Sequence, residues 1–260
     1  MGGGLESGQL QKRVRRAGRA ALDLLFPPLC ISCRAQVAEP GALCAQCWQT
    51  IQFLDGPMCA CCGLPFEFDP GGATLCAGCH ARPPAFDKAR AVMRYDEHSR
   101  GPILALKHGD RLDLTPGFTR WLDRGGRALL DEADLILPVP LHPTRLWRRR
   151  YNQSAELARA LSRHSGKPAN LVALSRARAT PSQGAMRSAK ARRRNMLGAF
   201  KVSQRHKSAI AGRNLLLIDD VLTTGATVDA CARALKRAGA AKVFVLALAR
   251  VVRPLAGDII

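Results

Sequence analysis

The stretch LLLIDDVLTTGAT, at residues 215–227, constrains the fold more than any other part of this chain. Its four apolar residues, 215–218, predict a buried strand, and we expect the adjacent acids Asp219 and Asp220 to end that strand. A loop with three hydroxyl side chains and one glycine then leads into a predicted helix. Loop N–H groups at a helix start attract an anion, and paired carboxylates bind sugar hydroxyls or Mg2+. The stretch therefore predicts a site for a phosphorylated sugar.

An alternative interpretation is an ordinary strand–turn–helix whose acids only cap the helix. A cap requires one acid, whereas here two acids precede a loop that is rich in hydroxyl groups. We therefore favour a binding loop, whose candidate residues are Asp219, Asp220, Thr223, Thr224, Gly225, Ala226 and Thr227.

Strands and helices alternate along the second half of the chain. Apolar runs predict strands at residues 88–95, 134–140, 171–174, 199–202, 215–218 and 242–251. Helical periodicity predicts helices at residues 102–107, 112–130, 153–164 and 227–238. This alternation is typical of an α/β domain with a parallel sheet and helices on both faces. Ligands of such sheets bind at the carboxyl ends of the strands, so we expect residues 138–142 and 219–227 to line one crevice.

Paired cysteines dominate the first third of the chain. Nine of the ten cysteines lie between residues 30 and 79, and eight form a C-x2-C-x10-C-x2-C unit followed by a C-x2-C-x13-C-x2-C unit. This duplication is typical of zinc ribbons or knuckles. Residues 27–82 hold few large apolar side chains, so bound Zn2+ would supply folding free energy. The predicted ligands of one or two structural zinc ions are Cys30, Cys33, Cys44, Cys47, Cys59, Cys62, Cys76 and Cys79.

Other interpretations of the cysteines are weaker. Disulfides need an oxidising compartment, and a redox-active CxxC usually occurs singly. The pairing stays open, because sequential and cross-braced arrangements both fit the spacing. Cys61 and His80 lie beside ligands and are expected to be bystanders, and Cys231 is expected to be a small buried residue of a helix.

The N-terminal segment, residues 1–26, predicts an amphipathic helix. Five cations precede the apolar part, which Asp23 interrupts, and no small-residue cleavage site follows, so a signal peptide is the weaker interpretation. Binding of those cations to a membrane surface is a minor alternative. Without a run of about 18 apolar residues, we expect no membrane span. Without a secretion signal, we expect a cytoplasmic location.

Positive charge is concentrated in one segment. The chain carries a net +20, and residues 145–213 contain 18 Lys or Arg against one acid, Glu156, which gives a net +17. A solvated face usually mixes both signs, so we interpret this segment as a surface for phosphates or nucleic acid. The alternative is a basic composition without a ligand.

The motifs of this chain, and their order along it, resemble those of known protein families. The strand, paired acids and T-x-G-x-T loop of residues 215–227 resemble the phosphoribosyl-pyrophosphate (PRPP) motif of type I phosphoribosyltransferases. The paired cysteines, then PVPLHPTRLWRRRYNQS, RARATPSQ, RRRN and IDDVLTTGAT, resemble the layout of the ComF family of competence-associated, phosphoribosyltransferase-like proteins. The likeness covers nearly all of the chain from Leu22. The family usually has RRGFNQ, so Arg150 replaces a glycine and Tyr151 a phenylalanine.

The resemblance implies a type I phosphoribosyltransferase fold over residues 88–260, behind a zinc module at residues 27–82. It implies that Asp219 and Asp220, the candidate catalytic residues, hold the ribose 2′- and 3′-hydroxyls, and that residues 223–227 wrap the 5′-phosphate. The pyrophosphate with Mg2+ would lie toward a second loop, residues 139–142, and toward cations of the basic stretch 176–195, which we expect to be a mobile loop. The residues expected to contact it are Val139, Pro140, Leu141, His142, Arg176, Arg187 and Arg192.

Two functions from different classes follow. The first is an enzyme that transfers the phosphoribosyl group of PRPP to an acceptor that the sequence does not identify. The second is a module for single-stranded DNA that keeps a PRPP pocket as a relic or sensor, linked to DNA uptake and its proteins. Trp147 and Tyr151 would stack on bases or pack against the sheet. The candidate nucleic-acid residues are Arg148, Arg149, Arg150, Tyr151, Arg193 and Arg194.

Overall fold

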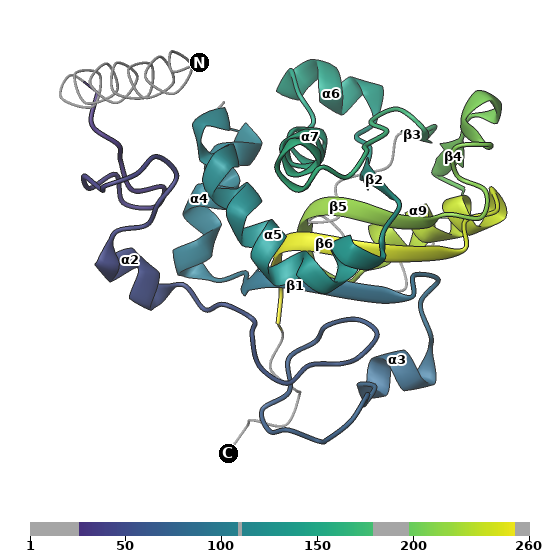
Figure 1. The fold of residues 1–260 in the computed structure, drawn as a ribbon, viewed down its shortest axis with the longest axis horizontal. Coiled ribbons are helices and arrows are strands. Elements are labelled where there is room, and N and C mark those ends of the chain that lie inside the picture. The colour runs from purple at the N-terminus through teal and green to yellow at the C-terminus, as the bar shows by residue number, and fades with distance from the viewer. Residues whose placement is uncertain (1–25, 109–110, 179–197, 253–260) are drawn as a thin grey trace, which may run out of the picture.

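The computed structural model describes residues 26–108, 111–178 and 198–252 (Figure 1). The predicted N-terminal helix, apart from Phe26, lies outside the described residues. So do five cations of the basic segment, namely Arg187, Lys190, Arg192, Arg193 and Arg194. Within the described residues, no helix is both long enough and apolar enough to cross a bilayer.

Four parallel strands form the central sheet in the order β1-β6-β5-β2. The strands are β1 (Lys88–Arg94), β2 (Leu135–Pro138), β5 (Asn214–Leu222) and β6 (Lys242–Arg250). The central strand β6 is buried from Val243 to Ala249, as its unbroken apolar run requires. A separate antiparallel pair consists of β3 (Leu174–Arg176) and β4 (Phe200–Val202). The predicted parallel sheet is confirmed.

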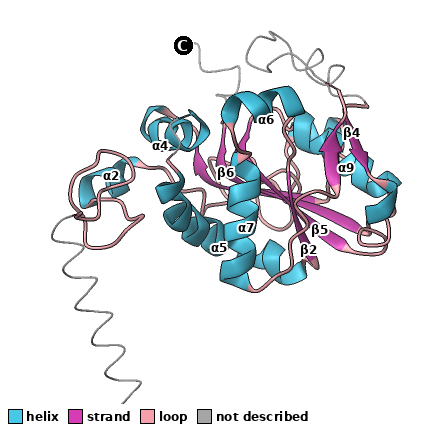
Figure 2. Cartoon of the chain, turned by 90° about the horizontal axis from the view of Figure 1, so that it is seen from above, coloured by secondary structure: helices cyan, strands magenta, loops and turns pink. Residues whose placement is uncertain are grey.

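Two hydrophobic cores lie on opposite faces of this sheet, because alternate residues of a strand point to opposite sides. Leu216 and Ile218 belong to one core, and Leu215 and Leu217 to the other. The elements of the first face are α4 (Glu97–His108), η1 (Leu112–Leu114), α5 (Thr115–Glu132) and α7 (Gln153–Ser165), and α9 (Ala226–Arg237) covers the second. Helix α7 packs on β2 and β5, whereas α5 packs mainly on β1 and β6. Figure 2 shows α9 beside β4. The described helices therefore flank both faces, as predicted.

The prediction that Asp219 and Asp220 end their strand is wrong. Strand β5 continues to Leu222, because β6 pairs with it in register from Asn214 to that residue. Asp219 lies opposite Ala247, and Leu222 opposite Arg250. The backbone of both acids is therefore held by the sheet, which fixes the direction of their side chains.

The cysteine-rich module covers the free edge of β1, which is the outermost strand in the sheet order (Figure 1). Backbone hydrogen bonds join the two, including Ala89 N–H to Cys61 O at 2.6 Å and Leu54 N–H to Val92 O at 2.9 Å. Gly63, at φ 68°, allows this approach, since a Cβ there would lie 2.5 Å from Ala89 O. Covering the edge satisfies backbone groups that would otherwise attract another strand. The short helices of the module are α2 (Ala45–Thr50) and α3 (Ala77–Ala81).

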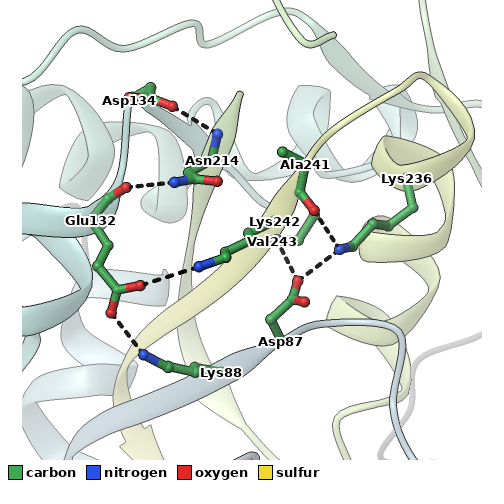
Figure 3. Close-up of polar contacts among 9 residues, drawn as sticks. All are labelled: Asp87, Lys88, Glu132, Asp134, Asn214, Lys236, Ala241, Lys242 and Val243. Atoms are coloured by element: carbon green, nitrogen blue, oxygen red, sulfur yellow. Dashed lines mark hydrogen bonds and ion pairs between the residues drawn. The ribbon is translucent and has the colours of Figure 1, made fainter. Parts of the chain in front are cut away.

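Ion pairs and hydrogen bonds close the amino ends of the strands (Figure 3). Glu132 lies 2.7 Å from Lys88 Nζ and 3.8 Å from Lys242 Nζ. Asp87 accepts the Val243 N–H at 2.7 Å and lies 2.9 Å from Lys236 Nζ. Each of these carboxylates therefore faces a cation, and this end of the sheet has a structural role.

Candidate functional site

A cleft of about 320 Å³ opens at the carboxyl ends of β2 and β5. It brings together eight residues that the sequence predicted for the sugar phosphate site: Val139, Pro140, Leu141, Arg176, Asp219, Asp220, Thr223 and Thr227. Segments separated by some 80 residues in the chain therefore meet at one edge, as the parallel sheet predicts.

The two acids have different partners. Asp220 is buried, and its Oδ2 accepts a hydrogen bond from Gln153 Nε2 at 2.7 Å and lies 3.0 Å from Lys107 Nζ. Asp219 Oδ1 accepts from Ser154 Oγ at 3.3 Å and from the Asp220 N–H at 3.0 Å. Asp220 is thus already neutralised by a cation, whereas Asp219 is the less compensated carboxylate.

The electrostatics of the pair follow from this difference. Burial raises the pKa of Asp219 to about 7, and the neighbouring Asp220 charge acts in the same direction. Lys107 and the hydrogen bonds from Asp220 and Ser154 oppose that rise. A carboxylate held in this state favours ligands that donate hydrogen bonds or carry a cation.

Lys107, Gln153 and Ser154 are site residues that the sequence interpretation missed. Gln153 and Ser154 begin α7, where Asn152 caps the helix by accepting the Ser154 N–H. Their local signal was the RRRYNQS stretch, which carries the family resemblance and includes both residues. Lys107 ends α4, and nothing in its local sequence indicates an acid 113 positions later.

The loop after β5 adopts a helix start with a glycine at its N-cap. Gly225 has φ 75°, a left-handed conformation that suits glycine, and α9 begins at Ala226. No side chain caps this helix start, and the partial positive charge of a helix N-terminus favours an anion there. Thr223 and Thr227 line the cleft, whereas Thr224 and Gly225 line a second cavity behind the loop.

The segment after β2 forms a helix that the sequence interpretation did not predict, α6 (Pro143–Arg149). His142 caps it by accepting the Thr144 N–H at 3.3 Å, and this predicted pyrophosphate-loop residue does not line the cleft. Arg149 does line the cleft. Arg150, where the ComF family has glycine, ends the helix in a left-handed conformation at φ 65°. The position therefore keeps the backbone shape of a glycine despite its side chain.

The two aromatic residues near this helix behave differently. Trp147 is 88% exposed. The Tyr151 hydroxyl instead donates a hydrogen bond to the backbone oxygen of Leu106, in α4. Of the two candidate stacking groups, Trp147 is thus presented to solvent, while Tyr151 is part of the packing.

The eight predicted zinc ligands form two groups of four. Cys30, Cys33, Cys44 and Cys47 make the first group, and Cys59, Cys62, Cys76 and Cys79 the second. In each group the four sulfurs lie within 4.8 Å of one another, so the grouping is sequential and not cross-braced. Cys61 and His80 belong to neither group, and Cys231 is buried in α9, as expected.

The donor set fits zinc. Burial alone raises the pKa of Cys30, but N–H groups of Cys44, Cys33 and Ser32 outweigh it and lower the pKa to about 6. The second group repeats the pattern, with the Cys76 N–H 3.3 Å from Cys59 Sγ. Burial raises the pKa of Cys47 to about 12, and hydrogen bonds that its thiol donates to neighbouring cysteines add to that rise. Thiols this close ionise together only beside a cation, which a tetrahedral Zn2+ supplies.

Comparison with family models defines the class of protein. Residues 21–80 match the double zinc ribbon domain, and residues 151–255 match the phosphoribosyl transferase domain. Together with the parallel sheet, these matches define a phosphoribosyltransferase-like α/β domain behind a double zinc ribbon.

Relatives then define the family. The DNA utilization protein YhgH of Escherichia coli O157:H7 is 34% identical over 87% of this chain and 99% of that protein. Competence protein F of Haemophilus influenzae is 32% identical, over 85% and 96% respectively. Competence protein ComFC of Bacillus subtilis is 26% identical, over 76% and 80%. The chain belongs to this ComF family of DNA utilization and competence proteins.

Proposed function

We propose that the cleft binds PRPP together with Mg2+. The observation that carries this proposal is the meeting of the acids Asp219 and Asp220, the hydroxyls of Thr223 and Thr227, and the buried cation Arg176 in one cleft. The match to the phosphoribosyl transferase domain supports it, because the matched range includes the acids and the loop.

In this proposal each part of the ligand meets a group of suitable chemistry. The 5′-phosphate lies on the loop before α9, where N–H groups and threonine hydroxyls donate hydrogen bonds. The ribose hydroxyls donate to Asp219 and Asp220. The pyrophosphate faces residues 139–141, and Lys107, Arg149 and Arg176 are the described cations that line the cleft.

The same arrangement supports phosphoribosyl transfer. The bond between the anomeric carbon and the pyrophosphate oxygen breaks, and its electron pair leaves with the pyrophosphate. An acceptor nucleophile forms the new bond to that carbon and releases a proton. Fixed carboxylates beside the ribose stabilise the oxocarbenium-like state, cations stabilise the leaving group, and no nucleophilic side chain is needed. Bound Mg2+ would supply further neutralisation of the pyrophosphate charge.

Calorimetric titration with PRPP and Mg2+ tests the binding proposal, with ribose 5-phosphate and pyrophosphate as separate controls. We expect PRPP to bind more tightly than either part, because it engages both ends of the cleft. If PRPP binds no better than pyrophosphate, the loop before α9 is not a phosphate site. Release of pyrophosphate on addition of bases or amines separates turnover from binding.

A second function, binding of single-stranded DNA, is favoured by Trp147. The Trp147 ring is 88% exposed on α6 and provides a stacking surface, and Arg149 of the same helix lines the cleft. The relatives' names refer to DNA utilization and competence. We therefore propose that this cytoplasmic family member acts on or near imported single-stranded DNA, with DNA-uptake proteins as partners.

Fluorescence anisotropy with a labelled oligonucleotide tests this second function. Trp147→Ala should weaken binding by about tenfold, since base stacking contributes about 1–3 kcal/mol. Trp48→Ala is the matched control, because Trp48 is also partly exposed but packs against Phe53 in the zinc module. Affinity should also fall steeply as salt rises. Equal loss in both variants, or a flat salt response, would count against a DNA surface on α6.

A further inference from the structure

The loop between β5 and α9 separates two cavities. Thr223 and Thr227 line the cleft, whereas Thr224 and Gly225 line a cavity of about 270 Å³ on the other side. Cys62, Cys76 and Cys79, three members of the second cysteine group, line that same cavity. The loop thus has the proposed ligand site on one side and a metal group on the other.

Arg250 connects the second cysteine group to the sheet. Its guanidinium donates a hydrogen bond to Cys62 O at 2.6 Å and lies 3.6 Å from Cys62 Sγ. A donor that contacts both the backbone and the sulfur of a metal ligand fixes the orientation of that ligand. The side chain of this one residue therefore orients a member of the metal group.

The backbone of Arg250 lies directly beside the start of the loop. Arg250 pairs with Leu222 in the β5–β6 register, and the next residue, Val251, donates its N–H to Leu222 O at 3.0 Å. Leu222 immediately precedes Thr223. A displacement of Arg250 is consequently transmitted to the loop through the sheet hydrogen bonds.

A second connection runs through the segment that follows the zinc module. The Ala85 N–H donates to Asp229 Oδ1 at 2.7 Å, and Asp229 is a buried residue in the first turn of α9. Phe86 lies against Gly225, with its ring 3.9 Å from the position of a Cβ. Both ends of the loop are thereby joined to the second cysteine group or its flanking chain.

The first cysteine group has a different location. It packs on α5, where Arg120 donates to Pro40 O at 3.1 Å and Gly41 lies against Gly117. Its cysteines are absent from the lining of both cavities described above. Two groups of the same chemistry therefore differ in their connection to the loop, which makes the first an internal control for the second.

We propose that Arg250 is a positioning residue that couples the second cysteine group to the phosphate loop. Metal bound by Cys59, Cys62, Cys76 and Cys79 then holds residues 222–227 in the conformation that binds the phosphate, while metal in the first group does not. The expected effect on PRPP affinity rests on the proposed function, whereas the expected effect on the conformation of residues 222–227 does not.

Hydrogen–deuterium exchange of the full-length, zinc-loaded chain tests the coupling without any ligand. Cys76→Ser should accelerate exchange of the amides of residues 222–229 by about tenfold, since local opening then requires less free energy. Cys44→Ser, at the corresponding position of the first group, should leave those amides at parental rates. Equal exchange in the two variants overturns the proposal.

Arg250→Gln keeps the test decisive if Cys76→Ser does not fold. With two zinc ions still bound per chain, this variant should show faster loop exchange, and Arg250→Lys should restore part of the protection because it keeps the charge but loses the planar fork. Arg120→Gln is the matched control. Parental exchange in Arg250→Gln contradicts the coupling.

The affinity measurement distinguishes this inference from the proposed function. PRPP affinity should fall about tenfold in Arg250→Gln and stay unchanged in Arg120→Gln, a shift of about 1.4 kcal/mol. If the parent binds PRPP and both variants bind equally, the coupling is wrong and the function stands. If the parent does not bind PRPP, the function is wrong, and loop exchange alone decides the coupling.

Discussion

The two ends of the central sheet use carboxylates in opposite ways. At the amino end, Glu132 lies between Lys88 and Lys242, and Asp87 contacts Lys236 (Figure 3). The cation at Lys88 lowers the pKa of Glu132. At the carboxyl end, burial and a neighbouring acid raise the pKa of Asp219. Carboxylates at the amino end are therefore paired with cations, whereas the negative charge of Asp219 at the carboxyl end is only partly compensated.

This contrast indicates at which end of the sheet a ligand would gain more from the carboxylates. A carboxylate that is already paired gains little from a ligand, whereas one that is buried beside another acid gains hydrogen bonds and charge balance. The prediction follows that substitutions at the carboxyl end affect ligand binding more than stability, and substitutions at the amino end the reverse.

The largest expected effect is on ligand binding at the carboxyl end. The double substitution Asp219→Asn with Asp220→Asn should weaken PRPP binding at least about 100-fold, since hydrogen bonds to charged groups contribute about 1.5–3 kcal/mol each. The rise in melting temperature with PRPP and Mg2+ should disappear. A parental rise in this variant would show that the acids do not hold the ligand.

At the amino end, Asp87→Ala should lower stability and spare binding. It removes the acceptor of the buried Val243 N–H and the partner of Lys236, so the free energy of unfolding should fall by about 1–3 kcal/mol. Urea unfolding measures this loss, and calorimetry should give parental PRPP affinity. Loss of affinity as large as in the double variant would abolish the contrast between the two ends.

The pH dependence of stability sharpens the contrast further. Because the pKa of Asp219 is raised to about 7 in the folded state, the folded protein binds this proton more tightly than the unfolded chain. The stability that the proton contributes is full below the unfolded pKa of about 4 and is lost as pH rises to about 7. Asp219→Asn should therefore stabilise the zinc-loaded protein without PRPP by about 1–2 kcal/mol at pH about 8, and have little effect on its stability at pH about 5.

Urea unfolding of parent and Asp219→Asn at both pH values, with zinc present throughout, measures this difference. Each comparison is made at one pH, so any change in metal affinity affects both proteins alike. If Asp219→Asn is less stable than the parent at the higher pH, then neighbouring groups already compensate the Asp219 charge in the folded protein, and the prediction is wrong.

The smallest expected effect concerns Arg150, the residue that ends α6. Its left-handed conformation at φ 65° strains a residue with a side chain, so Arg150→Gly should raise the free energy of unfolding by about 0.5–1 kcal/mol. Gly166→Ala is the matched control, because Gly166 ends α7 at φ 75° and alanine there should destabilise by about 1 kcal/mol. Thermal unfolding of the three proteins measures both shifts.

Local patterns predicted most of the elements, and the errors have physical causes. Strand β5 runs through Asp219 and Asp220 because β6 supplies paired backbone groups, and no local propensity reports a neighbouring strand. The helix α6 was missed because it has only seven residues, three of them arginine, and lacks a long apolar stripe. The cysteine spacing fitted both sequential and cross-braced pairing, and the packing of the two units selected the sequential one.

The sequence by itself determined which chemistry this protein carries: two units of four thiols, an acid pair and a hydroxyl-rich loop at a helix start. Each of these depends on residues close together in the chain, so spacing alone defines it. The tertiary structure alone decided that Lys107 neutralises Asp220, that Tyr151 is used in packing, and that the second cysteine group lies behind the loop between β5 and α9. Those contacts join distant segments, and their geometry exists only once the sheet has brought the segments together.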